Sequence, residues 1–217
     1  MKIVLYGYWR SSSSHRVRLA LAVKKVPHET VTVNLLKGEQ RAPEHQAKSP
    51  MGVVPCLVID GKPFVESVAI VELLDELFPS PALYPRDPFA RARIRALVEI
   101  VNAGIQPLQN LLVLDRVSRE SEPRKEWLRF FIGRGLRSFE ALMAENEKEG
   151  VGGPFAFGSE VSAADVFLLP QLYAARRFDV DLSACPRILR AEAALLATDA
   201  AKAAAPENQP DAVLDKK

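Results

Sequence analysis

The proline-rich segment at residues 79–88 divides this chain into two parts with different patterns. The segment reads Pro-Ser-Pro-Ala-Leu-Tyr-Pro-Arg-Asp-Pro, and proline interrupts helices and strands because its φ is fixed and it has no N–H group. Before this segment the spacing of apolar residues alternates between strand and helix, and after it the spacing is helical only. The sequence therefore predicts two domains, at residues 1–80 and 88–217, joined by a linker at residues 81–87.

The first part predicts a small α+β domain. Asp60-Gly61 is a hairpin signal that makes the third and fourth strands antiparallel. The order βαβ followed by ββα predicts one sheet covered by helices. The expected strands are residues 2–8, 29–36 and 55–59 and a strand at Phe64–Val65; the expected helices are residues 14–25 and 67–78; residues 37–52 are expected to be a long irregular loop.

The second part predicts an all-α domain. Asp87 and Pro88 have the residue types of a helix N-cap and first helical position, and Ser162 to Asp165 form a capping box. The polar tail after Ala205 is expected to be loosely held. The expected helices are residues 88–117, as one long helix or a pair bent at Pro107, residues 123–148, a helix through residues 166–173, and residues 186–198.

Charge and cysteine content exclude several classes of function. The 217 residues include 29 Lys and Arg against 27 Asp and Glu, and no motif of aromatic and basic residues for nucleic acid is present. Cys56 and Cys185 match neither metal-ligand nor dithiol spacing, so we expect buried thiols and no metal site. The sequence has no signal-peptide pattern and no apolar run of about 18 residues, so we expect a cytoplasmic protein without a membrane partner.

Four serines, Ser11 to Ser14, lie between the first predicted strand and a basic helix. The first N–H groups of a helix have no intrahelical partner and carry the positive end of its dipole, so an anion is stabilised there. The cations Arg10, Arg16 and Arg18 add to this attraction. A thiolate supplied by a cofactor is one such anion, whereas simple helix capping explains the same serines without any ligand.

Several motifs resemble those of the cytosolic glutathione transferases. Besides the serine turn, Ser49–Pro55 resembles the loop that leads to a cis-proline, and Glu66–Ile70 resembles an acidic-Ser-x-Ala-Ile helix start. Residues 10–21 are similar to the zeta class, the maleylacetoacetate isomerase family, although Ser13 stands where that class usually has cysteine. The further similar segments are Gly104–Asn110, Arg177–Leu182 and Asn208–Asp211. The resemblance implies a thioredoxin-like N-terminal domain followed by an all-α C-terminal domain, glutathione as cofactor, and a homodimer.

The resemblance also implies which residues act on the thiol and the substrate. Ser11 is expected to donate its hydroxyl proton to the sulfur of glutathione, with Ser12 and Ser13 as further catalytic candidates and Arg16 adding positive potential. Lowering a thiol pKa of ~8.5 by ~1–2 units requires roughly 1.4–2.7 kcal/mol, which a hydrogen bond and a helix dipole can supply. Arginine binds carboxylates bidentately, so Arg10 and Arg177 are expected to bind a dicarboxylic substrate.

The remaining implied contacts are to the rest of glutathione. A cis Pro55 would leave the main chain of Val54 to pair with the cysteinyl backbone of glutathione, as an added strand does. Ser67 suits the γ-glutamyl carboxylate, and Glu66 suits the neighbouring amine. The other implied contacts are Ser14, His15, Gln40, Gln106 and Asn110. For each of these residues an ordinary structural role, as a cap, a strand start or a surface residue, is the alternative.

The implied reaction is the glutathione-dependent cis–trans isomerisation of maleylacetoacetate to fumarylacetoacetate, in tyrosine and phenylalanine breakdown. Three alternatives stay open. Maleylpyruvate isomerases of the same group tend to have His in place of Gln106 and arginines in place of Leu111 and Leu112. A general glutathione transferase that conjugates electrophiles would not need Arg177. A non-catalytic interaction module can share the fold, whereas Ser13 disfavours a glutaredoxin-like reductase.

Overall fold

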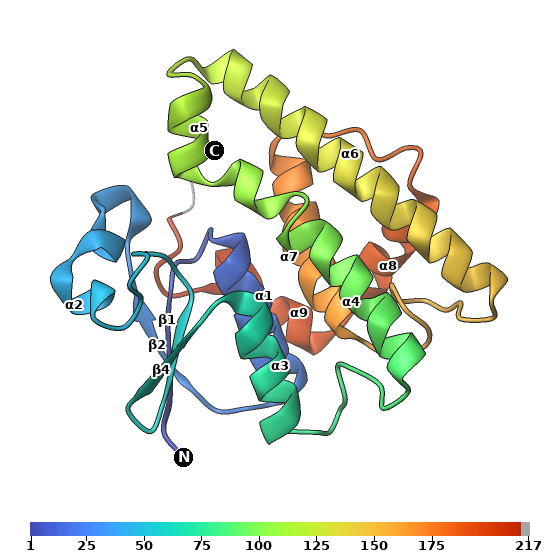
Figure 1. Ribbon diagram of the computed structural model, residues 1–217, viewed down its shortest axis with the longest axis horizontal. Coiled ribbons are helices and arrows are strands. Elements are labelled where there is room, and N and C mark those ends of the chain that lie inside the picture. Colours follow the sequence, from blue (N-terminus) through green and yellow to red (C-terminus); the bar gives the residue numbers. More distant parts are fainter. Residues whose placement is uncertain (214–217) are drawn as a thin grey trace. The chain divides into compact units, whose positions relative to one another are not determined.

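The structure, a computed structural model, describes residues 1–213 and divides into two compact units (Figure 1). One unit consists of Met1–Ala82 together with the segment that begins at Thr198, and the other is Leu83–Ala197. The sequence predicts a single helical domain over residues 88–217, and the structure differs at its end. The segment from Thr198 belongs with the N-terminal unit because its helix α9 (Asp199–Ala204) packs against α1 (Ser12–Val23).

The first unit contains a four-stranded sheet in the order β2-β1-β3-β4. β1 (Ile3–Gly7) pairs in parallel with β2 (Glu29–Thr32) and antiparallel with β3 (Cys56–Ile59), which pairs antiparallel with β4 (Lys62–Val65). Helix α1 connects the two parallel strands, and a tight turn connects β3 to β4. The predicted βαβ and ββα order of a thioredoxin-like domain is therefore confirmed.

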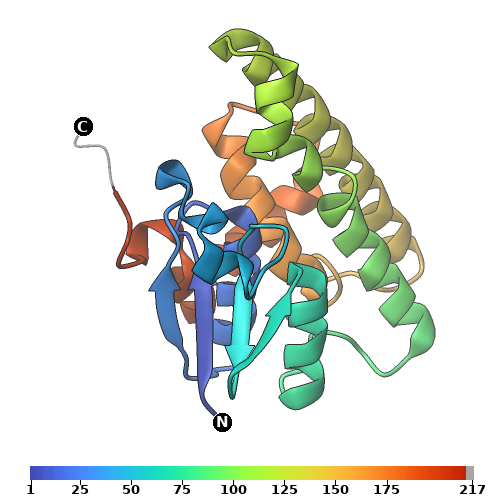
Figure 2. The same ribbon diagram turned by 60° about the vertical axis from the view of Figure 1, so that its left-hand side comes forward.

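Helices α1 and α3 (Ser67–Leu77) pack against each other beside this sheet, and α9 lies along α1 (Figure 2). A short 3-10 helix, η4 (Pro206–Asn208), follows α9. Burial of apolar side chains between the sheet and these helices is the main source of stability in a unit of this kind. The fully buried side chains of this core include Leu5, Leu19, Leu21, Leu57, Ile70 and Leu74.

The second strand is shorter than the predicted residues 29–36. Val33 N–H still donates to the Gly7 carbonyl, but the Asn34 side chain then accepts the N–H groups of Leu36 and Lys37 and starts a helical turn. Asparagine is a strong N-cap, so its local bonds end the strand. The predicted loop at residues 37–52 contains short helices: η1 (Leu35–Lys37) begins just before it, and η2 (Glu39–Arg41) and α2 (Pro43–Gln46) lie within it.

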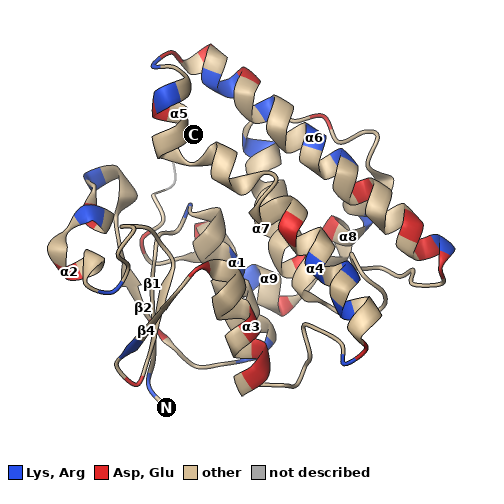
Figure 3. Cartoon of the chain, viewed as in Figure 1, with Lys and Arg blue, Asp and Glu red and all other residues tan. Residues whose placement is uncertain are grey.

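The second unit is helical throughout. Asp87 caps its first helix by accepting the N–H of Ala90 at 2.7 Å, as predicted. Helix α4 ends at Asn102, before Pro107, and a bend of 54° lies after Pro107, between Pro88–Gln109 and Leu111–Val117. Basic and acidic residues are mixed along α6 (Figure 3). The elements are α4 (Pro88–Asn102), η3 (Gln106–Gln109), α5 (Leu111–Val117), α6 (Ser121–Lys148), α7 (Ala163–Arg177) and α8 (Pro186–Leu196).

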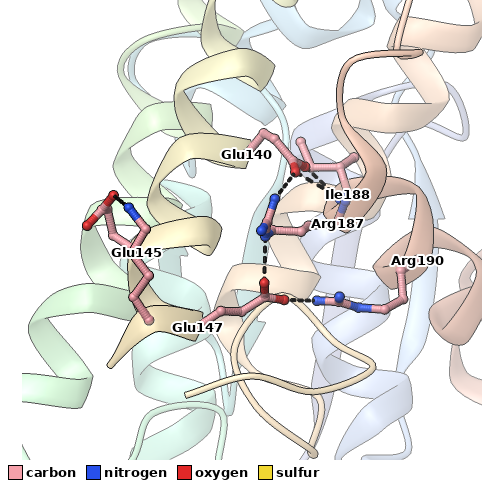
Figure 4. A network of polar contacts seen from close by, with 7 residues as sticks. Glu140, Glu145, Glu147, Arg187, Ile188 and Arg190 are labelled. Carbon is pink, nitrogen blue, oxygen red and sulfur yellow. Dashed lines mark hydrogen bonds and ion pairs between the residues drawn. The ribbon is translucent and has the colours of Figure 1, made fainter. Parts of the chain in front are cut away.

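A polar network joins α6 to the start of α8 (Figure 4). The buried carboxylate of Glu140 accepts the N–H groups of Arg187 at 3.2 Å and Ile188 at 3.0 Å, and it also pairs with the Arg187 guanidinium at 3.1 Å. Glu147, about two helical turns further along α6, pairs with Arg187 and Arg190. Glu140 therefore satisfies N–H groups that a helix N-terminus otherwise leaves without partners.

Candidate functional site

The first turn of α1 presents the hydroxyl of Ser11 at the N-terminus of the helix. Ser11 Oγ accepts the N–H of Ser14 at 3.2 Å, and the N–H of Ser11 donates to the Tyr8 carbonyl at 3.0 Å. A hydroxyl accepts two hydrogen bonds and donates one, so this cap leaves the Ser11 proton available. Because Ser11 is only half-buried, a ligand can reach that proton.

Ser12 and Ser13 add two main-chain donors to this turn. Both residues are half-buried, and within residues 1–213 neither N–H donates to a protein acceptor. They are the orphan donors of a helix N-terminus, where the helix dipole adds positive potential. The turn therefore has the composition of an anion site, with the Ser11 hydroxyl proton and two N–H groups.

Ser14 and His15, which the resemblance implies as cofactor contacts, are both buried in the structure. Ser14 is fully buried on the face of α1 that also buries Val17 and Leu21, and its Oγ accepts the N–H of Tyr8 at 3.4 Å. His15 is buried as well. Burial, with a smaller effect from the Arg18 charge, lowers the pKa of His15 well below its usual range, so its imidazole is neutral near pH 7.

Arg16 connects α1 to the start of α3. Its side chain is 1% exposed, and its Nη1 donates to Ser67 Oγ at 3.0 Å. Ser67 is the first residue of α3 and is itself buried. The sequence predicts that Arg16 acts at the serine turn, whereas the structure directs its guanidinium to the second helix N-terminus. The positive charge of Arg16 therefore favours an anion at α3.

The N-terminus of α3 has an unusual backbone. Glu66 occupies the N-cap position with a φ of 68°, and its side chain forms no cap hydrogen bond. A positive φ is strained for any residue with a side chain, and such strain collects at ligand-binding positions. The N–H groups of Ser67 and Val68 find no acceptor in the part of the chain that the structure describes. This helix start is therefore open to an anionic group.

The peptide bond between Val54 and Pro55 is cis, as the resemblance implies. The loop before it is fixed at the Val53 carbonyl, which accepts from His45 Nε2 at 2.8 Å and from Ser49 Oγ at 2.9 Å. In residues 1–213 the N–H and C=O groups of Val54 have no hydrogen-bond partner. Main-chain groups of this kind can pair with an extended peptide as a neighbouring strand would.

Gln40 lies against the same loop. A Cβ atom at Gly52, where φ is +62°, would be 3.0 Å from the Gln40 carbonyl oxygen, so glycine permits the close approach. The side-chain Oε1 of Gln40 is buried and has no hydrogen-bond partner among the described residues. A buried acceptor without a donor costs free energy, so a ligand N–H would be stabilised at this atom.

Arg10 stacks on the ring of Trp9 just before the serine turn. Its guanidinium carbon lies 4.9 Å from the ring centroid, and the arginine is half-buried whereas Trp9 is buried. This cation–π contact limits the positions that the Arg10 side chain adopts. Arg10 is therefore held beside the turn that carries Ser11.

Three predicted site residues belong to the second unit. Gln106 begins η3 and is half-buried. Asn110 is exposed and accepts the N–H of Leu112 at 3.0 Å, so it caps α5. Arg177 is exposed at the end of α7, with its guanidinium 5.1 Å from the ring of Phe178. For Asn110 the structure shows the ordinary capping role directly.

Several contacts fix the η3 segment that begins at Gln106. A Cβ atom at Gly135 would be 2.2 Å from Ile105 Cγ1, so only glycine allows α6 to approach the start of this segment. Trp127 Nε1 donates to the Leu108 carbonyl at 3.0 Å. Gln109 also donates to the buried Gln171 side chain at 2.8 Å. The residues of η3 are therefore held by packing and by polar bonds together.

Two residues that the prediction leaves out of the site bind the turn that precedes α1. Arg18, read from the sequence only as a nearby charge, is buried and donates to the carbonyls of Tyr8 and Trp9. Asp211, within the tail that was expected to be loosely held, accepts the N–H of Trp9 at 3.0 Å. The similarity of Asn208–Asp211 to the zeta class is the sequence signal that points to this tail.

Residues 1–213 contain no cluster of three or more side chains able to hold a metal ion. Among these residues, no single helix is long and apolar enough to cross a membrane; Pro88–Gln109 and Leu111–Val117, bent by 54°, meet that criterion only as a pair, by length and composition. Cys56 and Cys185 are both buried free thiols, as expected.

Family models and relatives match these features along nearly the whole chain. Residues 5–82 match the glutathione S-transferase N-terminal domain, and residues 88–197 match the glutathione S-transferase C-terminal domain. The chain is 45% identical over 210 residues to the probable maleylacetoacetate isomerase 2 of Drosophila melanogaster. This match covers 96% of the present chain and 89% of the Drosophila protein.

Two solved structures are similar to the whole molecule. A holo maleyl pyruvate isomerase, a bacterial glutathione S-transferase in the zeta class, has a TM-score of 0.93 and 38% identity, covering 97% of this chain and 100% of that one. The maleylacetoacetate isomerase of Anaeromyxobacter dehalogenans 2CP-1, with dicarboxyethyl glutathione and citrate bound in its active site, has a TM-score of 0.86 and 44% identity, covering 99% and 95%. The chain therefore belongs to the glutathione S-transferase family and, within it, to the zeta class of the maleylacetoacetate isomerases.

Proposed function

We propose that this protein is a glutathione-dependent isomerase that converts maleylacetoacetate to fumarylacetoacetate. The observation that carries the proposal is the first turn of α1, where an available hydroxyl proton at Ser11 lies next to two orphan N–H groups. This arrangement suits a thiolate, and the chain has no thiol of its own in that turn. The names of relatives at 41–45% identity support the same substrate.

The described residues fit glutathione at several separate points. Ser67 suits a carboxylate, because Arg16 donates to its hydroxyl and the N–H groups at the start of α3 have no acceptor among the described residues. The unpaired main chain of Val54 suits the peptide backbone of the tripeptide. The buried Oε1 of Gln40 suits an N–H donor. Glu66, Gln106 and Asn110 stay in the proposal as further contacts, as the resemblance implies.

Glutathione, when bound, supplies a thiolate that adds to the cis double bond of the substrate and leaves after rotation to the trans form. The task of Ser11 is to donate a hydrogen bond to sulfur and so to favour the thiolate over the thiol. The N–H groups of Ser12 and Ser13 add to the positive potential at the same place. Arg10 and Arg177 bind the two carboxylates of the substrate by charge-assisted hydrogen bonds.

A second candidate substrate is maleylpyruvate. The observation in its favour is the TM-score of 0.93 to a maleyl pyruvate isomerase. Against it stand Gln106, Leu111 and Leu112, where the resemblance places His and arginines in maleylpyruvate isomerases. Leu111 and Leu112 are 50% and 61% exposed, so this chain offers apolar surface where that activity would call for cations.

The deciding experiment measures cis-to-trans turnover of both substrates with and without glutathione. We expect maleylacetoacetate to be converted with a higher kcat/KM than maleylpyruvate, and only when glutathione is present. Turnover that does not need glutathione would overturn the mechanism, and a preference for maleylpyruvate would overturn the substrate. Conjugation of aromatic electrophiles without isomerisation would indicate a general transferase. Failure to bind immobilised glutathione would indicate an interaction module.

The proposal extends to a homodimer that acts in the cytoplasm in the breakdown of tyrosine and phenylalanine, as the resemblance implies. Size-exclusion chromatography with light scattering tests the oligomeric state directly. The expected mass is twice the chain mass of 24.0 kDa, and the mass of a single chain would contradict it.

A further inference from the structure

The end of the described chain returns to the turn that precedes α1. The Asp211 carboxylate accepts the main-chain N–H of Trp9 at 3.0 Å, although the two residues are 202 positions apart in sequence. Ala212 packs against a small buried cluster that contains Tyr8 and Trp9. The tail, residues 205–213, therefore lies against the backbone just before Ser11.

Arg18 links the same turn to α9, the helix that leads into this tail. Its Nη1 and Nη2 donate to the carbonyls of Tyr8 at 3.3 Å and Trp9 at 3.0 Å, and its Nε donates to the carbonyl of Ala204, the last residue of α9, at 3.3 Å. Arg18 is 5% exposed, and burial lowers its pKa to about 10, which leaves it charged at neutral pH. The negative charge of Asp211 opposes this lowering.

These bonds act on the residue that carries the proposed chemistry. The Tyr8 carbonyl that Arg18 holds also accepts the N–H of Ser11 at 3.0 Å. Trp9, whose N–H Asp211 holds, is the residue on which Arg10 stacks. A hydroxyl stabilises a thiolate only when its position is fixed to within a fraction of an ångström, so groups that fix the turn affect the chemistry without touching the ligand.

We propose that Asp211, together with Arg18, is a positioning residue that fixes the Tyr8–Ser11 turn and thereby sets the position of the Ser11 hydroxyl. The role of the hydroxyl rests on the proposed function, whereas the effect on the turn does not. Without Asp211, the N–H of Trp9 loses its acceptor and the buried Arg18 loses its counter-charge. The turn then has more than one conformation available, and the Ser11 proton is less often in place.

The first test measures amide hydrogen exchange of residues 8–14 in the full chain without glutathione. We expect Asp211→Ala to speed exchange in this stretch by about tenfold or more while the strands β3 and β4 exchange at the wild-type rate. Asp211→Asn keeps an acceptor for Trp9 but lacks the charge, so its effect should be smaller. Asn208→Ala is the matched control: it removes a 2.7 Å bond from Asn208 Nδ2 to the Lys202 carbonyl in the same tail, with no link to the turn.

The second test measures the ionisation of glutathione bound to each variant, by the ultraviolet absorbance of the thiolate. Asp211→Ala should raise the pKa of the bound thiol by about one unit and lower kcat by about tenfold, with a change of less than about threefold in KM for glutathione. Asn208→Ala should match the wild type in both. If Asp211→Ala does not fold, the same thiol pKa and kcat are measured on Asp211→Asn.

The outcomes separate this proposal from the proposed function. Unchanged exchange at residues 8–14 in Asp211→Ala, with only a lower Tm, would overturn the positioning role and leave a purely structural contact. Faster exchange with an unchanged thiol pKa would overturn the link to the Ser11 hydroxyl. A wild-type protein that does not bind glutathione would overturn the proposed function, and the exchange experiment would still decide whether Asp211 orders the turn.

Discussion

Ser11 has two hydrogen-bonding tasks that a single hydroxyl can perform together. Its oxygen accepts the N–H of Ser14 at 3.2 Å, and its proton remains to be donated to a ligand. Accepting a bond polarises the O–H group and makes it a stronger donor. The capping interpretation and the catalytic interpretation of this serine are therefore compatible, and the cap holds the hydroxyl in place for the donation.

We expect Ser11→Ala to lower kcat/KM for isomerisation by about tenfold to a hundredfold, because a hydrogen bond to a charged group contributes roughly 1.5–3 kcal/mol. Ser13→Ala, which removes a hydroxyl from the same turn but leaves the cap intact, should lower it less than about threefold. The loss of the cap also lowers stability by roughly 0.5–2 kcal/mol. Steady-state kinetics measured well below the Tm of each variant separates the effect on catalysis from the effect on stability. Equal losses of kcat/KM in the two variants would show that Ser11 is not the hydroxyl that acts on sulfur.

At the scale of single elements, Asp165 links the start of α7 to the preceding loop. Its carboxylate accepts the N–H groups of Ala156 at 2.7 Å and Ser162 at 2.9 Å and the Ser162 hydroxyl at 2.8 Å. Burial raises the pKa of Asp165 to about 6 despite these donors. The folded protein thus keeps a proton that the unfolded chain releases at a pKa of about 3.9, and the free energy of unfolding falls as the pH rises through this range.

We expect the free energy of unfolding of Asp165→Asn, whose side chain cannot ionise, not to fall with rising pH in this way. Urea denaturation at pH 4.5 and 7.5 should show the stability gap between wild type and variant narrowing by about 2 kcal/mol at the higher pH. The exposed Asp181 is the control. The N–H of Ser183 lowers the pKa of Asp181, so Asp181 is ionised in the folded and unfolded chain at both pH values, and the stability gap for Asp181→Asn should stay nearly constant. Parallel curves for Asp165→Asn would contradict the expectation.

Glu140 supports a second element, because it satisfies the N–H groups of Arg187 and Ile188 at the start of α8 (Figure 4). We expect Glu140→Ala to lower the free energy of unfolding by about 2–4 kcal/mol, since buried donors and the Arg187 charge lose their partner. Glu147→Ala removes a more exposed carboxylate from the same network and should cost about 1 kcal/mol or less. Similar Tm values for the two variants would show that the caps do not matter.

Local signals predicted these elements well, because the residues that interact are close in sequence. The capping box at Ser162 and Asp165 joins positions three apart, and the β3–β4 hairpin follows from Asp60-Gly61. The second strand was predicted too long because its alternating pattern continues past Thr32, while the Asn34 side chain bonds locally and ends the strand. Apolar spacing carries no information about that bond.

The predicted site also shows that sequence signals locate local motifs but not the contacts that their side chains make. The serine turn, the cis Pro55 and the start of α3 are local motifs, and each is found where it was expected. The resemblance implies that Ser14 and His15 touch the cofactor, with capping and packing as the alternatives, and the structure buries both. Residue types alone do not show which side of a first helical turn faces the interior.

At the scale of the whole molecule, the two ends of the chain form one unit. The bond between Asp211 and Trp9 spans 202 positions, so no window of sequence contains both partners, and a polar tail gives no apolar pattern to detect. The tail was therefore expected to be loosely held. In the structure α9 packs against α1, with Ala201 and Ala204 buried. The N-terminal unit is complete only when the C-terminal segment, which begins at Thr198, has been made.

A chain that stops at Ala197 tests this dependence, and the two tryptophans allow each unit to be followed separately. Trp9 reports on the unit that contains the C-terminal segment, and Trp127 reports on the unit Leu83–Ala197. We expect the Trp9 fluorescence transition, measured in a Trp127→Phe background, to move to lower urea by at least about 0.7 M in the shortened chain. A loss of roughly 2–3 kcal/mol with a slope of about 1–3 kcal/mol/M gives this shift.

In the Trp9→Phe background the Trp127 transition should stay within about 0.3 M of its full-length midpoint, because the helices of its unit keep all their internal contacts. A chain that stops at Val213 is the control, since it keeps α9, Asp211 and Ala212, and both transitions should match the full-length protein. If both tryptophans report the same large shift in the chain that stops at Ala197, the loss is global. The C-terminal segment would then stabilise the molecule as a whole rather than the unit that carries Ser11.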